Sequence, residues 1–274
     1  MKEVATIILN RNLPKVTDKL CEHLEKYDGN LTDIYIIEAG SEKDKLSKYA
    51  TWYVDDDEVI KNGLRYSRGM NYGLKELLKE GKFENYRAFF LLTNDTEFEK
   101  VPTIKILLEI LEEHNKVGIL SPCSKRWGEK LLLEDEPTKY FWFIHNNSYL
   151  IRRTFIEDIF DKGSATIMSF LFDGSNFRGY CNEHELIAKA YVNDWAAAIT
   201  SKVWTQENEG YLLDYADQIK TEKYEENLKL YVAEGKAWLR KKYGFKSKWS
   251  MVQYVKSFYD EFFQFNPELN KYKL

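Results

Sequence analysis

The sequence lacks any apolar run approaching the roughly 20 residues that a membrane-spanning helix needs. It also lacks a strong charge of either sign, because the net charge is −4 and the pI is near 5.8, which argues against a nucleic-acid-binding protein. Cysteine is scarce, and Cys21, Cys123 and Cys181 show neither disulfide nor metal-ligand spacing, so we expect reduced thiols in a cytoplasmic protein. The opening residues Met1-Lys2-Glu3 do not resemble a signal peptide.

Glycine-rich phosphate-binding turns are missing as well. A dinucleotide-dependent oxidoreductase needs such a turn after its first strand, where this chain has the segment Asn10–Pro14. The sequence holds no Gly-x-x-x-x-Gly-Lys segment, which excludes a P-loop ATPase. A nucleotidyltransferase also uses metal-bound carboxylates and stays open as an alternative. It would need a glycine-rich basic loop after the first strand, which this sequence lacks.

Strand and helix patterns alternate along most of the chain. We expect strands at 4–9, 34–37, 51–54, 88–92, 117–120 and 195–204, with a strand pair or one interrupted strand at 140–151. We expect helices at 14–28, 74–78, 102–114, 153–160 and 181–191, a loop at 163–179, and helical segments from 211 onward. This alternation predicts an α/β protein with a mostly parallel sheet flanked by helices.

The central stretch of the sequence is the apolar run from Ala88 to Leu92. A continuous apolar run of strand length suits a strand buried on both faces of a parallel sheet. It ends abruptly in polar residues that include Asp95 and Glu97. Ligands bind outside the carboxyl ends of such strands, and divalent cations prefer oxygen ligands shared with substrate phosphates. We therefore expect a metal site here, although a solvated turn after the strand explains the same pattern equally well.

Five segments together resemble the inverting nucleotide-sugar glycosyltransferases of family two, which have the GT-A fold. Segment 7–12 is similar to the family's opening strand-Asn-Arg signature, 36–44 to its strand ending in Asp-Asn-Gly-Ser-x-Asp, and 68–73 to its segment ending in Asn-x-Gly before a helix. Segment 92–97 stands where the family keeps Asp-x-Asp, and 183–189 resembles its downstream acidic motif with a basic residue. The resemblance covers about residues 4–205.

The resemblance implies a Rossmann-like GT-A enzyme that transfers a hexose or deoxyhexose from a UDP- or dTDP-sugar to a glycan or polysaccharide hydroxyl. It implies that Glu38 contacts the base and ribose of the donor, and that Asp95 and Glu97 hold Mn²⁺ or Mg²⁺ on the diphosphate. The full set of implied donor-binding residues is Leu9, Asn10, Arg11, Glu38, Arg68, Asn71, Thr93 and Asn94. Thr93 stands where the family has its first Asp, so a ribose contact there would come from a hydroxyl. The alternative for Glu38 is that it only ends a strand and faces solvent. The alternative for Arg68 and Asn71 is that they belong to the turn that starts a helix.

The resemblance implies that Glu183 is the general base, which takes the proton of the acceptor hydroxyl. Glu185 lies two residues further on and cannot share the same helix face, so we assign it, with His145, to acceptor binding. The alternative is that both carboxylates simply favour a helix start. Asp173 and Glu207 are the next candidates for the base.

The chain departs from the family where many members have a metal-binding His after the strand 195–204. Here the sequence reads Thr205-Gln206-Glu207, which puts metal dependence in doubt. A non-catalytic GT-A-like domain that binds sugar nucleotides or a partner is therefore an alternative. The acidic run 55–58 is a rival cation site that ranks below Asp95.

The domain organisation that we expect is one GT-A domain followed by a helical extension. The GT-A domain spans 1–210, with a nucleotide-binding half at about 1–121 and an acceptor half at about 122–210. Residues 211–274 form the extension, in which Gly235 weakens the helical pattern by about 1 kcal/mol. The extension has three open roles: covering the main domain, joining a homodimer, or touching the inner face of a membrane.

Overall fold

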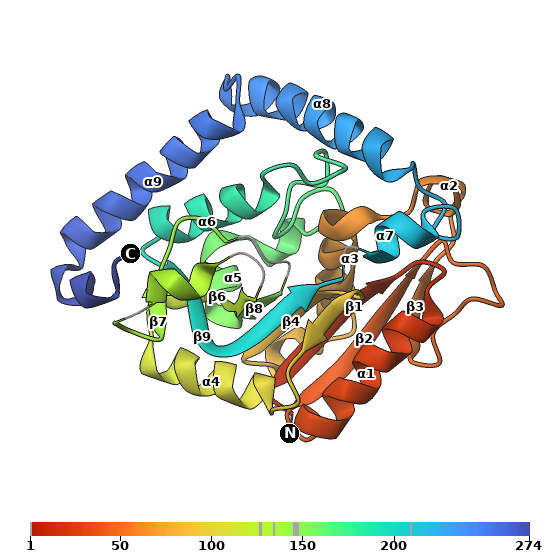
Figure 1. The fold of residues 1–274 in the computed structure, drawn as a ribbon, viewed down its shortest axis with the longest axis horizontal. Helices are drawn as coiled ribbons and strands as arrows, with labels where there is room; N and C mark the ends of the chain where they lie inside the picture. Colours follow the sequence, from red (N-terminus) through yellow and green to blue (C-terminus); the bar gives the residue numbers. More distant parts are fainter. Residues whose placement is uncertain (1, 126–127, 134, 145–147, 209) are drawn as a thin grey trace.

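The computed structural model describes residues 2–125, 128–133, 135–144, 148–208 and 210–274. Within them, nine strands form one curled sheet flanked by helices, and two long C-terminal helices arch over one side of the molecule (Figure 1). The expected α/β architecture is confirmed. None of the described helices is long and apolar enough to cross a membrane.

The amino-terminal half of the sheet is parallel. Its strands lie in the order β3 (Ala50–Val54), β2 (Thr32–Ala39), β1 (Val4–Asn10) and β4 (Ala88–Thr93). The apolar run of β4 is fully buried, as expected for a strand covered on both faces. The helices of this half are α1 (Pro14–Asp28), α2 (Asp57–Asn62), α3 (Arg65–Lys79) and α4 (Thr103–Glu113). Because the four strands run the same way, their carboxyl ends meet at one edge.

Helix α3 begins earlier than the sequence predicts. We expected residues 68–73 to precede the helix, but α3 starts at Arg65 and contains that whole segment. A Cβ on Gly69 would lie only 2.6 Å from Leu9 Cδ1, and Gly73 approaches β1 in the same way. The two glycines therefore mark a close contact between helix and sheet rather than a turn.

The second half of the sheet is mixed. β8 (Tyr149–Arg152) runs antiparallel to β4 and to β6 (Val117–Ser124), and β6 pairs in parallel with β9 (Ala196–Glu207). β5 (Thr96–Phe98) and β7 (Thr138–Tyr140) both pair antiparallel with β9. Most of the paired residues belong to the parallel pairs, so the sheet is mostly parallel as expected.

Within the described residues of the aromatic segment, 140–144 and 148–151, the two strand ends belong to β7 and β8, which pair with other strands and not with each other. β7 ends at Tyr140 and lies beside β9, whereas β8 begins at Tyr149 and lies between β4 and β6. The position of each of these two strands is therefore set by neighbouring strands that are distant in the sequence. The helices that follow are α5 (Arg153–Ile159) and α6 (Asn182–Val192).

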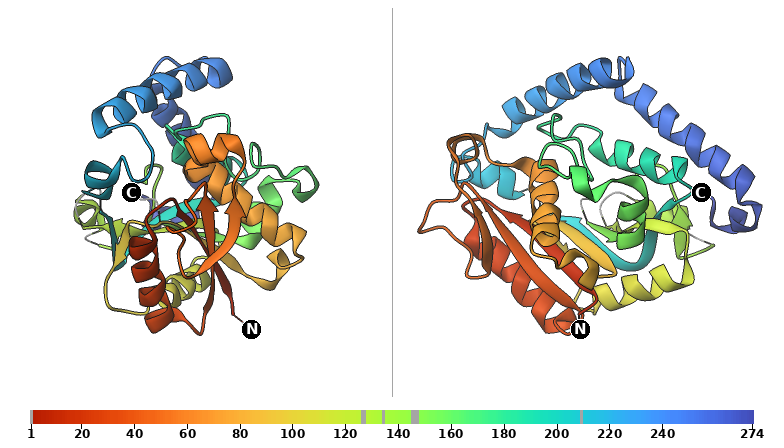
Figure 2. Two further views of the ribbon diagram at one scale, coloured as in Figure 1. Left: turned by 90° about the vertical axis from the view of Figure 1, so that its right-hand side faces the viewer. Right: turned by 180° about the vertical axis from the view of Figure 1, so that it is seen from behind.

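The C-terminal helices are α7 (Gly210–Tyr215), α8 (Tyr224–Tyr243) and α9 (Lys248–Phe265). Helix α9 packs against α6, and α8 passes over the loop that precedes α6 (Figure 2). Helix α8 is continuous through Gly235, where a Cβ would lie 2.1 Å from Tyr180 Cβ. Glycine at this position therefore lets α8 approach Tyr180 closely.

Candidate functional site

The carboxyl edge of β1, β2 and β4 borders a cavity of about 160 Å³, which we call the strand-edge cavity. Its lining includes Leu9, Arg11, Ala39, Arg65, Asn94 and Ile219. Three of the predicted donor-binding residues, Leu9, Arg11 and Asn94, thus come together here. Sequence reasoning missed Arg65 at the start of α3 and the contribution from the segment before α8.

Asn10 and Glu38, also predicted to bind the donor, form a buried network beneath this edge. Asn10 Nδ2 donates to both carboxylate oxygens of Glu38 at 3.1 and 2.9 Å, and the Ser47 amide donates to the same carboxylate at 2.8 Å. Burial raises the pKa of Glu38, although these hydrogen bonds oppose the shift. Glu38 is 2% exposed, so its contacts in this structure fix the strand ends rather than line the cavity. A donor contact by these two residues stays a prediction.

Arg11 lies across the cavity rim. Its Nη2 donates to the carbonyls of Ile60 and Lys61, each at 3.0 Å. Gly63, at φ +71°, passes so close that a Cβ there would lie 2.5 Å from Arg11 Nη1. The tight turn after α2 therefore sets the position of this guanidinium.

Arg68 and Asn71 lie away from the strand-edge cavity and hold the loop that precedes α6. Arg68 Nε donates to the Gly174 carbonyl at 2.8 Å. Asn71 exchanges hydrogen bonds with the backbone of Phe172 at 2.8 and 3.0 Å and also donates to Ile167. These contacts bring the loop onto α3; a direct contact of either residue with the donor stays a prediction.

The acidic loop after β4 borders a second cavity, of about 230 Å³, lined by residues that include Lys19, His23, Asn94, Asp95 and Glu97. Asn94 separates this cavity from the strand-edge cavity, because it lines both. Thr93 Oγ1 lies 3.1 Å from Thr96 Oγ1. Glu97 accepts hydrogen bonds from Gln206 and Asn208, at 3.4 and 3.3 Å.

A metal site built from the protein alone is not present among the described residues, which contain no group of three or more His, Cys, Asp or Glu suited to a metal ion. Asp95 and Glu97 offer carboxylates, and Mn²⁺ or Mg²⁺ often binds one or two carboxylates together with substrate phosphates. The residues therefore fit a metal held jointly with a diphosphate. The rival acidic run has a different role, since Asp56 caps α2 by accepting from the Val59 amide at 3.0 Å.

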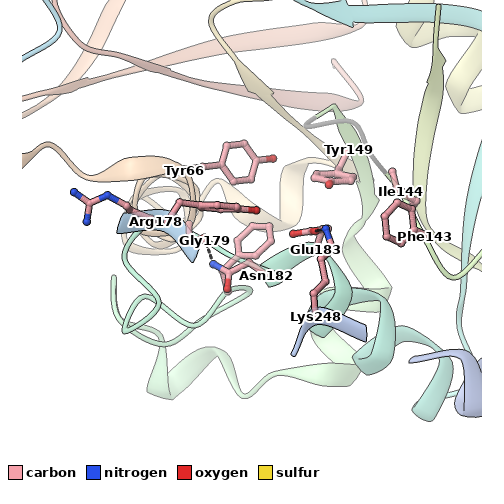
Figure 3. Close-up of a pocket in the computed structure, with 12 residues that line it drawn as sticks. Tyr66, Phe143, Ile144, Tyr149, Arg178, Gly179, Asn182, Glu183 and Lys248 are labelled. Atoms are coloured by element: carbon pink, nitrogen blue, oxygen red, sulfur yellow. Dashed lines mark hydrogen bonds and ion pairs between the residues drawn. The ribbon is translucent and has the colours of Figure 1, made fainter. Parts of the chain in front are cut away.

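Glu183 lies in a third cavity, of about 240 Å³, which it lines together with Tyr66 of α3 and Tyr149 of β8 (Figure 3). We call it the aromatic cavity, since its lining includes Tyr66, Phe143, Tyr149, Phe172 and Tyr231 together with Glu183 and Lys248. Glu183 stands in the first turn of α6. The turn before α6 has Gly179 at φ +80° and Cys181 at φ +65°, and this left-handed backbone directs the helix start into the cavity.

The charge on Glu183 is stabilised despite its burial. Burial raises the pKa of Glu183, but His184 and Lys248 outweigh that effect and hold it below its usual value. His184 Nδ1 lies 2.7 Å from Glu183 Oε1, and Lys248 Nζ lies 3.9 Å from the same oxygen. Burial raises the pKa of Tyr66 and Tyr149 well above the usual value. The cavity therefore places a carboxylate whose pKa is lowered among hydroxyls whose pKa values are raised.

Glu185 and Asp173 have other partners. Glu185 accepts from Tyr243 Oη at 2.5 Å and lies 2.6 Å from Lys242 Nζ, as expected for a carboxylate on a different helix face from Glu183. Asp173 accepts from Trp238 Nε1 at 3.0 Å and from Lys242 Nζ at 2.6 Å. Both carboxylates hold the end of α8, and an acceptor contact by Glu185 stays a prediction. His145 lies outside the described residues.

Sequence reasoning missed most of the aromatic cavity. The sequence pattern gave no indication that Tyr66 or Tyr231 belongs to the site, whereas Tyr149 lies in an aromatic segment whose rings could stack on sugars. The one available signal was the density of aromatic residues in the segment 140–149. Tyr66 Oη is buried and has no hydrogen-bond partner among the described residues, which leaves a hydroxyl for a ligand.

Several solved structures resemble this chain in fold. The chain matches TarS 1–349 of S. aureus in complex with UDP-GlcNAc at a TM-score of 0.55 and 13% identity, covering 96% of this chain and 73% of that one. It spans 44% of a longer TarS chain, with a TM-score of 0.51. The fold is the GT-A glycosyltransferase fold.

Two further GT-A structures match at similar levels. The mannosyltransferase PcManGT from Pyrobaculum calidifontis, in complex with GDP-Man and Mn²⁺, has a TM-score of 0.53 at 11% identity, covering 93% of this chain and 73% of that one. Glucosyl-3-phosphoglycerate synthase from Mycobacterium tuberculosis, in complex with Mn²⁺, UDP and phosphoglyceric acid, has a TM-score of 0.54 at 10% identity, covering 90% and 80%. No protein-family model and no curated protein matches the sequence.

Proposed function

We propose that this protein is an inverting glycosyltransferase of family two that transfers a sugar from a nucleoside diphosphate sugar to an acceptor hydroxyl. The observation that carries the proposal is the Glu183 carboxylate, partly buried in an aromatic cavity on a GT-A scaffold, with Lys248 and His184 beside it. Aromatic faces suit sugar rings, and a carboxylate among them suits removal of a hydroxyl proton. The acceptor is a glycan or polysaccharide intermediate.

The donor belongs at the carboxyl edge of the parallel strands. Its nucleoside, from a UDP- or dTDP-sugar, occupies the strand-edge cavity beside Leu9, Ala39 and Asn94. The structures that resemble this chain include complexes with UDP-GlcNAc and with GDP-Man, which supports a nucleotide-sugar donor but does not choose the base. Asp95 and Glu97 would hold a divalent metal with the diphosphate, and such an ion neutralises the charge of the leaving group.

The chemical step follows from the position of Glu183. An acceptor hydroxyl in the aromatic cavity donates its proton to the Glu183 carboxylate while its oxygen attacks the anomeric carbon from the side opposite the diphosphate. The bond to the diphosphate oxygen breaks, and the nucleoside diphosphate leaves with the bonding electrons. Lys248 Nζ lies 3.9 Å from the carboxylate that takes the proton, and Tyr66 offers a hydroxyl to orient the sugar.

The experiment that tests the function is a thermal-shift panel of nucleoside diphosphates and their sugars, with and without Mn²⁺, followed by an assay for release of the diphosphate. We expect one nucleotide class to raise the melting temperature and its sugar to be slowly hydrolysed. Binding without any release of diphosphate would favour the second candidate, a non-catalytic sugar-nucleotide-binding domain. That candidate is supported by Thr93, which replaces a carboxylate in the acidic loop. The absence of any shift across the panel would contradict both.

A further inference from the structure

Two arginines near the donor edge share one carboxylate from the segment between α7 and α8. Glu222 Oε2 accepts from Arg65 Nη2 at 3.0 Å, and Glu222 Oε1 accepts from Arg178 Nη2 at 2.5 Å. Thr221 Oγ1 also accepts from Arg65 Nη2, at 2.7 Å. One anionic group therefore bridges two guanidinium groups that come from different parts of the chain.

These arginines line a fourth cavity, of about 490 Å³, which we call the arginine cavity. Arg65 also lines the strand-edge cavity, and Arg178 also lines the aromatic cavity. The arginine cavity thus lies between the proposed place of the nucleoside and the proposed place of the general base. In a nucleoside diphosphate sugar, the diphosphate lies between the nucleoside and the reacting carbon.

Glu222 does not satisfy every guanidinium nitrogen near this cavity. Arg65 Nε and Arg11 Nε are buried and have no hydrogen-bond partner among the described residues. Burial and the neighbouring Arg178 lower the pKa of Arg65, whereas Glu222 opposes that shift. Arg178 also contacts Glu234 and Asn227 on α8. The ring of Phe177 lies 4.7 to 5.8 Å from the guanidiniums of Arg65, Arg68 and Arg178, which adds to the gathering of cations around this cavity.

We infer that Arg65 and Arg178 bind the diphosphate of the donor, and that Glu222 occupies their anion site in this structure and is displaced when the donor binds. The inference rests on the proposed function and adds two arginines to Asp95 and Glu97, which line a different cavity and would reach the diphosphate through a metal. Guanidinium forks recognise carboxylate and phosphate oxygens with the same geometry. A diphosphate carries more negative charge than one carboxylate, so it competes well for the pair.

The segment that carries Glu222 closes over the donor edge through further contacts. Asn12 Nδ2 donates to the Gln218 carbonyl at 2.8 Å, and Gln218 Nε2 donates to the Asn12 carbonyl at 2.6 Å. Lys220 pairs with Glu42 at 2.9 Å. Ile219 and Thr221 line the strand-edge cavity itself. The segment that carries Glu222 therefore lies against the place of the nucleoside.

The test is calorimetric titration of inorganic pyrophosphate and of UDP in EDTA, which removes metal from the readout. We expect Glu222→Gln to bind pyrophosphate at least ~10-fold more tightly than wild type, because the competing charge is gone. We expect Arg65→Gln, made alone or in the Glu222→Gln protein, to weaken binding by at least ~10-fold. Glu226→Gln, an exposed position on α8 with the same change of charge, is the matched control. Tighter binding cannot come from misfolding, so the Glu222 variant tests the inference even if Arg65→Gln fails to fold.

Equal pyrophosphate affinity of Glu222→Gln and Glu226→Gln overturns the inference, and so does an Arg65→Gln protein that binds as wild type does. If no nucleoside diphosphate sugar binds to wild type while Glu222→Gln still gains affinity for pyrophosphate, the anion site is supported and the glycosyltransferase function falls. If the donor binds and turns over but both variants match wild type, the function is supported and this anion site is overturned.

Discussion

Replacing Glu183 by Gln tests the proposed chemistry most directly. The amide keeps the size and polarity of the side chain but cannot take a proton, and general bases contribute ~10²–10⁴-fold to rate. His184 and Lys248 hold the pKa of Glu183 below its usual value of 4.5, which makes the carboxylate fully ionised at neutral pH but a weaker base. We expect a loss of at least ~10²-fold in the rate of transfer, or about 2.7 kcal/mol or more of barrier.

Donor affinity should stay within about twofold of wild type, because Glu183 lines the aromatic cavity and not the strand-edge cavity. The assay compares single-turnover transfer, or slow donor hydrolysis while the acceptor is unknown, with calorimetric binding of the donor. Glu157→Gln on α5 is a matched control, since its side chain is 24% exposed against 20% for Glu183. Full activity of Glu183→Gln would refute the reasoning, and Glu207 would be the next base to test.

Three further changes test the fold and the donor site. Gly235→Ala should lower stability by about 1–3 kcal/mol in a thermal melt, because its Cβ would lie 2.1 Å from Tyr180 Cβ. Asp173→Asn should cost about 1 kcal/mol at pH 7, because it weakens the contact with Lys242 that holds α8. The pKa of Asp173 is held below its usual 3.8, because hydrogen bonds from Lys242 and its neighbours outweigh the effect of burial. The stability that the Asp173 carboxylate contributes is therefore present above pH 3.8 and is lost as the pH falls through the pKa of Asp173 in the folded protein. Asp95→Ala should abolish the Mn²⁺-dependent part of nucleoside diphosphate binding in calorimetry while the protein remains folded.

Each of these changes has a control and a contradicting result. Ala233→Gly, at an exposed position of α8, should cost only about 1 kcal/mol through helix propensity, so an unchanged or raised melting point for Gly235→Ala would contradict the close contact. Asp161→Asn is the control for Asp173→Asn. A stability difference between Asp173→Asn and wild type that stays unchanged down to pH 2 would contradict the charge argument. Asp55→Ala, in the exposed acidic run, is the control for Asp95→Ala. Equal Mn²⁺-dependent affinity for the nucleoside diphosphate in Asp95→Ala and wild type would contradict the metal assignment.

The periodicity of the sequence predicted the longer strands β1, β2, β3 and β4 and the helices α1 and α4 of the nucleotide-binding half, but not α2, β5 or the start of α3. The run from Ala88 to Leu92 is apolar at every position, and only burial on both faces makes such a run stable, so β4 and its place in a parallel sheet could be foreseen. Short strands in the second half could not. Tyr140 and Tyr149 lie in one aromatic segment, but β7 and β8 are placed by β9, β4 and β6, which are distant in the chain.

The sequence by itself determined the order of strands and helices, the buried faces and the presence of Glu183 at a helix start, because these depend on residues close together in the chain. The tertiary structure decided which polar groups meet. Glu38 and Asn71 differ little in sequence pattern from residues that face a cavity, yet the first is buried against Asn10 and the second holds a loop. Arg65, Arg178 and Glu222 come from three distant segments of the chain, so no local sequence pattern predicts their contact. Side-chain direction at a strand end or helix start is set by the packing of the whole chain, which is why the site took shape only in three dimensions.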